Sequence, residues 1–78
     1  MSKTLFFNVP FYKKNKIEKK VINDLGCPCY KIVGNTKYYS DNKDYWVVLS
    51  PGLLMVCVHS EDKISETQNI FLYSPRLS

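Results

Sequence analysis

Two apolar runs separated by a short turn sequence most strongly limit what this chain can fold into. The runs at 45–49 (YWVVL) and 53–58 (LLMVCV) flank Pro51 and Gly52. Proline followed by glycine at the two central positions predicts a type II turn, so we expect the runs to pair as antiparallel strands. Both alternating faces of each run are apolar, and strands of this kind normally lie between two layers of structure.

The segments before this hairpin predict one helix and further strands. The run at 4–9 (TLFFNV) predicts a strand that ends before a proline. Residues 15–25 predict an amphipathic helix, with Asn15 as its N-cap, Glu18 completing a capping box and Gly26 just beyond its end. Its apolar stripe comprises Ile17, Val21, Ile22 and Leu25. Residues 29–33 and 36–39 predict a hairpin around a Gly-Asn turn.

Residues 60–68 predict a polar loop with weak helix potential, and residues 69–74 (NIFLYS) predict a last strand. The segments together predict a single α+β domain over residues 1–78. One amphipathic helix packs on a four- to five-stranded, mainly antiparallel sheet, in the order β-α-β-β-β-β-β.

One helix covers only one side of such a sheet. The second apolar side needs cover from the N-terminal segment and the 60–68 loop, from a second copy of the chain, or from another protein. Since large exposed apolar patches rarely persist without a role, we expect an interface, most simply in a homodimer. The contact residues expected there are Tyr38, Tyr39, Tyr45 and Trp46.

The basic residues gather in the first quarter of the chain. The net charge is +4, and the first 20 residues carry six lysines against one glutamate. On a helical wheel the lysines oppose the apolar stripe, which is typical of a solvated face. Lysines near a helix N-terminus cost a few tenths of a kcal/mol each, so an anionic partner, nucleic acid or an acidic protein surface, is the other interpretation. The candidate residues are Lys13, Lys14, Lys16, Lys19 and Lys20.

The three cysteines and the single histidine allow a zinc hypothesis. Cys27, Cys29, Cys57 and His59 formally complete a Cys₃His set. The Cys-x-Cys spacing does not match the Cys-x₂₋₄-Cys of zinc knuckles, and Cys57 lies in the most apolar run. We therefore favour buried structural thiols, with neither metal nor cofactor, and nothing resembles a Cys-x-x-Cys redox pair.

Several functional classes have no support in the sequence. No apolar run approaches the roughly 18 residues of a membrane span, and the N-terminus does not match a signal peptide. An odd number of cysteines favours a reducing compartment, so we expect a cytoplasmic protein. No nucleophile–base motif or phosphate-binding glycine loop is present, so we do not expect an enzyme.

These observations favour a non-enzymatic protein that docks on a host protein or nucleoprotein complex. A short, lysine- and asparagine-rich chain suits a phage or mobile-element inhibitor of a host system. A small basic module that binds RNA or DNA through the lysines is an alternative, because Phe11 and Tyr12 adjoin them as stacking residues. A second alternative is a small-ligand sponge at a dimer seam.

Overall fold

The computed structural model of the protein describes residues 2–76, with side chains as far as residue 71, and has the predicted α+β class. The ends of the predicted 1–78 domain lie outside this range. The elements are β1 (Lys3–Asn8), η1 (Phe11–Lys13), α1 (Lys14–Asn23), β2 (Cys29–Val33), β3 (Thr36–Ser40), β4 (Tyr45–Ser50), β5 (Leu53–Val58), η2 (Glu61–Lys63) and α2 (Ile64–Arg76). None of the helices within residues 2–76 is long and apolar enough to cross a membrane.

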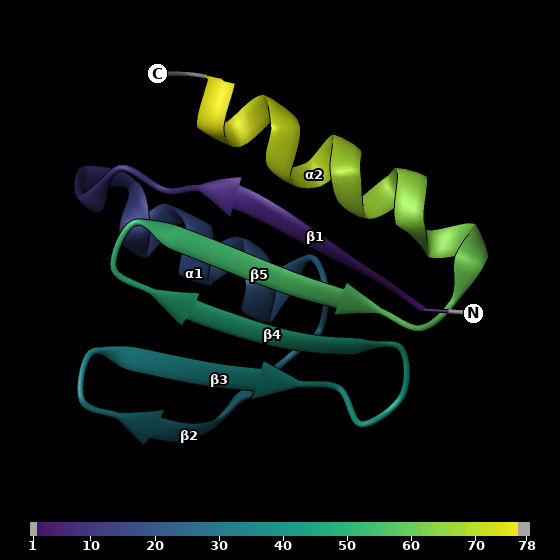
Figure 1. Ribbon diagram of the computed structural model, residues 1–78, viewed down its shortest axis with the longest axis horizontal. Coiled ribbons are helices and arrows are strands. Elements are labelled where there is room, and N and C mark those ends of the chain that lie inside the picture. Colours follow the sequence, from purple (N-terminus) through teal and green to yellow (C-terminus); the bar gives the residue numbers. More distant parts are fainter. Residues whose placement is uncertain (1, 77–78) are drawn as a thin grey trace.

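The five strands form one antiparallel sheet in the order β1-β5-β4-β3-β2 (Figure 1). Both predicted hairpins are confirmed. Gly52 in the β4–β5 turn has φ +80°, as the third residue of a type II turn requires. Gly34 in the β2–β3 turn has φ +59°. The first strand is not part of a hairpin, because β1 pairs with β5, which is the last strand along the chain.

The second helix corrects the prediction for the last part of the chain. The segment 60–68 is not a loop and the segment 69–74 is not a strand, because they form η2 and most of α2. Thr67 and Phe71 lie one helical turn apart and are fully buried. The ring of Phe71 packs 5.4 Å from that of Phe7, centroid to centroid. A helix therefore brings these two side chains onto the sheet.

The first helix forms where the periodicity places it, but without the predicted capping box. Asn15 lies inside α1, and the N-cap residue Lys13 makes no side-chain capping hydrogen bond. Glu18 instead reaches across to β3. The buried stripe is also narrower than predicted, since Ile22 is 41% exposed.

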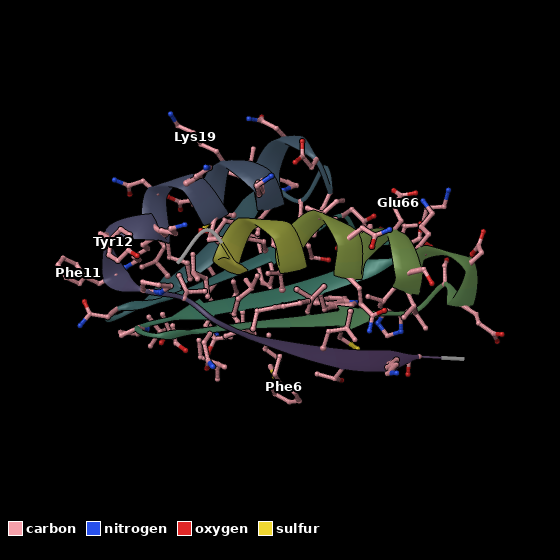
Figure 2. All side chains as sticks on the ribbon, turned by 90° about the horizontal axis from the view of Figure 1, so that it is seen from above. Phe6, Phe11, Tyr12, Lys19 and Glu66 are labelled. Carbon is pink, nitrogen blue, oxygen red and sulfur yellow. The ribbon has the colours of Figure 1, made fainter. Side chains whose placement is uncertain are left out.

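Both helices cover the same face of the sheet, and the core lies between the two layers (Figure 2). Strand residues in the core alternate with residues on the other face, as in Leu5 and Phe7 on either side of Phe6. Neither the N-terminal segment nor residues 60–68 cover that other face, because the first is a strand of the sheet and the second belongs to the helical layer. One of the two apolar faces is therefore uncovered by residues 2–76.

Candidate functional site: the open face of the sheet

The uncovered face, here called the open face, is a continuous apolar and aromatic surface. One row of paired residues crosses four strands, from Phe6 through Met55 and Val48 to Tyr38. The strand residues that the register and ring contacts place on this face are Thr4, Phe6, Asn8, Tyr30, Lys31, Val33, Thr36, Tyr38, Ser40, Trp46, Val48, Ser50, Leu53, Met55 and Cys57. Figure 2 shows Phe6 pointing away from both helices.

Three aromatic side chains form a cluster at the β2 end of the open face. The ring of Tyr30 meets Trp46 edge-on at a centroid distance of 6.1 Å and lies 6.4 Å from Tyr38. A bulge between Cys29 and Lys31 interrupts the β2 ladder and lets Tyr30 join the aromatic residues of the neighbouring strands. Trp46 remains 44% exposed despite these contacts, so the cluster presents ring surface to the solvent.

The open face is almost uncharged. Lys31 is the single charged side chain that the described strands place there, with its Nζ 5.8 Å from the centroid of the Tyr38 ring. From strand spacing and rise, five strands of this length span roughly 500 Å². That area lies within the range of the largest apolar patches on ordinary monomers, which are often functional.

Two of the four tyrosine and tryptophan residues predicted at an interface lie elsewhere. Tyr39 and Tyr45 face the helices and are 0% and 3% exposed, so they are core residues and not surface contacts. Tyr39 donates its hydroxyl hydrogen bond to Glu18. Burial, followed by this carboxylate, raises the pKa of Tyr39 well above its usual range. Tyr38 and Trp46, by contrast, lie on the open face as an interface would require.

The predicted lysines lie on the opposite side of the molecule, on and just before α1. Lys16 and Lys19 are exposed, and Lys19 points away from the sheet in Figure 2. Lys20 pairs with Asp24 at 3.8 Å, and the Nζ of Lys13 lies 5.9 Å from the centroid of the Tyr12 ring. Lys14 is half-buried at the start of the helix. The lysines and the aromatic cluster therefore belong to different surfaces.

The predicted zinc ligands are not brought together. Cys27 is fully buried, and burial raises the pKa of its thiol to about 12. Cys57 is on the open face, with its Sγ 3.9 Å from Nε2 of His59, whereas Cys29 is exposed and contacts the Lys31 carbonyl. Residues 2–76 contain no cluster of three or more potential metal ligands.

A small hollow of about 280 Å³ lies where the two hairpin turns approach the start of α1. Its lining residues are Val9, Phe11, Lys14, Asn35, Ser50, Pro51 and Gly52. The hydroxyl of Ser50 donates a hydrogen bond to the carbonyl of Leu53. Phe11 at its rim is 89% exposed. We assign no ligand to this hollow.

Sequence reasoning missed Phe6, Met55 and Tyr30 as parts of the site. The sequence does not single out Phe6, because Leu5, Phe6 and Phe7 are all apolar, and only the folded sheet shows that one face of β1 is covered. The bulge that places Tyr30 beside Trp46 has no signal in the sequence either, because it depends on pairing with β3. Comparison with protein-family models, curated proteins and solved structures finds no match for this chain.

Proposed function

We propose that the protein is a non-enzymatic docking module that binds another protein through the open face. The observation that carries this proposal is the uninterrupted row of apolar and aromatic side chains from Phe6 to Tyr38, which no described segment covers. Apolar patches of this size commonly mark interaction sites. The aromatic cluster supplies the residue types that dominate binding energy at protein interfaces.

The chemistry of the open face defines the partner surface. A face with one charge favours a partner whose contact region is apolar and uncharged at its centre. Lys31 lies on the edge strand β2, where a partner carboxylate would meet it at the rim. Trp46, Tyr30 and Tyr38 would supply the main aromatic contacts at the β2 end of the face, because they already support one another's rings.

A symmetric homodimer through the same face is a less favourable occupant. Two copies stacked in this way bury about 1,000 Å² in total, whereas obligate homodimers commonly bury 2,000 Å² or more. A different protein can also contact the rim of the face, and so extend the interface. We therefore commit to another protein, and make the homodimer an outcome of the test.

Nucleic-acid binding through the lysines stays a prediction. Modules that bind single strands combine a basic groove with aromatic residues on the same surface. Here Lys16 and Lys19 project from α1, on the side of the sheet opposite Trp46, so the aromatic residues on their side are Phe11 and Tyr12 and not the cluster. The setting as a phage or mobile-element inhibitor and the ligand-sponge alternative likewise stay predictions.

The proposal is tested with a partner captured from the source cells and then purified. Binding of the two pure proteins is measured for the wild type, for Trp46→Ala and for the control Lys19→Ala at low and moderate salt. We expect Trp46→Ala to weaken binding by about tenfold or more, as hot-spot tryptophans do. Lys19→Ala and added salt should change the affinity little.

The cysteines supply a footprint for the same experiment. The partner should slow alkylation of Cys57, which is half-buried on the open face, and leave the exposed Cys29 unchanged. A steep salt dependence together with loss of binding in the triple variant Lys16→Glu, Lys19→Glu, Lys20→Glu would contradict the proposal. So would a concentration-dependent homodimer that Trp46→Ala dissociates, because a second copy would then occupy the face.

A further inference from the structure

The outer edge of β1 has a regular row of backbone groups that no strand within residues 2–76 pairs with. Val9 donates its N–H to the carbonyl of Gly52 at 3.0 Å, so the odd-numbered residues of β1 are those that bond to β5. The alternation of an antiparallel ladder then directs the N–H and C=O groups of Thr4, Phe6 and Asn8 away from the sheet. The strand has no bulge in its pairing with β5 and no proline within it.

The two sides of the β1–β5 pair are related by an internal twofold. Each strand leads through a 3-10 turn into a helix on the same face of the sheet, β1 into η1 and α1 and β5 into η2 and α2. The pseudo-axis passes between the paired residues Phe6 and Met55. It relates the buried residues Leu5 and Phe7 of β1, and Val9 just after it, to Leu54, Val56 and Val58 of β5.

The helices follow the same relation. Ile17 and Val21 are the buried pair of α1, and Thr67 and Phe71 occupy the corresponding places in α2. The strand positions correspond at an offset of 49 residues and the helix positions at 50, so the second connection is one residue longer. The two strand–helix units are thus structural equivalents, although their sequences differ.

The equivalent edges of these units differ in one respect. The edge of β5 that faces away from β1 is occupied by β4, which pairs with it antiparallel through six residues. The corresponding edge of β1 has no neighbour among residues 2–76. Figure 1 shows α2 lying alongside and beyond β1, so the helix extends over the place where a sixth strand would lie.

We propose that the β1 edge binds an extended segment of another protein, which adds to the sheet as a sixth strand antiparallel to β1. Its backbone would bond to Thr4, Phe6 and Asn8, as β4 bonds to the related positions of β5. By the same relation, the segment presents apolar side chains at alternate positions, next to Leu5 and Phe7 and under α2. Strand addition at a free edge is a general mode of peptide recognition.

A second copy of this chain does not fit the same edge. Antiparallel pairing of two β1 strands places a twofold axis about 2.4 Å beyond each strand, half of the strand spacing. The axes of two packed helices lie about 8–10 Å apart. Each α2 would therefore have to lie on the side of its own β1 that faces β5. Because α2 extends beyond β1 (Figure 1), the two helices would overlap.

The other edge of the sheet is a poorer template. The bulge between Cys29 and Lys31 interrupts the regular pairing of β2, and bulges and lysines are common protections of edge strands. The proposal therefore concerns β1 alone. It goes beyond docking on the open face, since it uses backbone groups on a different border of the molecule.

The probe is a labelled peptide with the sequence of residues 43–51 (KDYWVVLSP), which carries the β4 pattern, with a scrambled peptide as its control. Binding is followed by fluorescence anisotropy, and amide exchange of the protein by NMR. We expect slower exchange at the amides of Thr4, Phe6 and Asn8. Phe6→Pro removes one outward N–H and should bind about tenfold or more weakly than Phe6→Ala, which loses the same ring but retains that N–H.

Proline is tolerated on edge strands when its missing N–H faces solvent, and a thermal melt checks that Phe6→Pro folds. If it does not fold, the pair Thr4→Pro and Thr4→Ala and the exchange data on the wild type decide. Unchanged exchange at Thr4, Phe6 and Asn8 with bound peptide overturns the proposal, since the peptide then displaces β4 or binds elsewhere. Protection that needs no peptide and grows with protein concentration also overturns it.

Discussion

Replacing Glu18 by alanine tests how the first helix is attached to the sheet. The carboxylate of Glu18 accepts hydrogen bonds from the buried hydroxyl of Tyr39 and from Nζ of Lys37, the latter at 2.9 Å. The Glu18 side chain is 22% exposed and that of Lys37 31%. Glu18→Ala therefore leaves the Tyr39 hydroxyl buried without this acceptor.

The expected magnitude follows from these contacts. A buried hydroxyl without a partner costs about 1–3 kcal/mol, and the ion pair is partly screened by water. We expect Glu18→Ala to lower the free energy of unfolding by about 2 kcal/mol, and Tyr39→Phe by about 1 kcal/mol. The double variant should cost about 2 kcal/mol and not about 3 kcal/mol, because the phenylalanine ring that replaces Tyr39 has no hydroxyl to satisfy.

Urea denaturation followed by circular dichroism measures all three variants, with Glu66→Ala on the exposed side of α2 as the control. The control should stay within about 0.5 kcal/mol of the wild type. If the two single effects add within about 0.5 kcal/mol in the double variant, the reasoning is refuted. A helix-capping role of Glu18, as the sequence predicted, would give that additive result.

The same variants carry a pH prediction. The hydrogen bonds from Tyr39 and then from Lys37 lower the pKa of Glu18 below its ordinary value. The contribution of this carboxylate is therefore fully present above the ordinary pKa of a glutamate and is lost as the pH falls through the lowered value. The difference in stability between the wild type and Glu18→Ala should shrink in strong acid, and a constant difference down to about pH 2 would contradict this assignment.

Two further predictions concern α2 and the thiols. Phe71→Ala removes a fully buried ring that packs on Phe7, and should lower the free energy of unfolding by about 3–5 kcal/mol in urea denaturation; a loss under about 1 kcal/mol would mean that α2 does not pack there. At about pH 8, iodoacetamide followed by mass spectrometry should modify the exposed Cys29 while Cys27, with its pKa raised to about 12 by burial, stays unmodified in the folded protein. Equal rates at the two cysteines would contradict the burial of Cys27.

The two proposed binding surfaces assign different tasks to the same sheet. Side chains such as Trp46 provide contact area on the open face, whereas the edge of β1 offers backbone groups to an extended chain. Phe6 belongs to both, because its ring lies on the open face and its N–H points outward from the edge. One partner that lays a strand along β1 and folds over the aromatic cluster would engage both surfaces together.

Local sequence was sufficient for most of the strands and for the first helix. Short apolar runs located β1, β4 and β5, and the Pro51–Gly52 turn identified the central hairpin. These features depend only on neighbours along the chain. The α+β class and the antiparallel sheet follow from them.

The last element required the tertiary structure. Residues 69–74 contain aliphatic and aromatic residues that suit a strand, and their local pattern does not separate the two periodicities. Ile64, Thr67 and Phe71 pack on one face only in a helix, because in a strand the side chains of residues three apart would point to opposite faces. Tertiary packing decides between a helix and a strand here, because the helix covers β1 and places Phe71 on Phe7.

The sequence by itself determined that the central strands have two apolar faces, and it left open what covers the second one. It did not determine which face is buried, because side chains alternate and either side of β4 could meet the helices. The register of β1 against β5 and the crossing of both helices on one side place Tyr39 and Tyr45 inside and Trp46 outside. That choice depends on packing between distant segments, so the aromatic cluster of the site exists only in the folded chain.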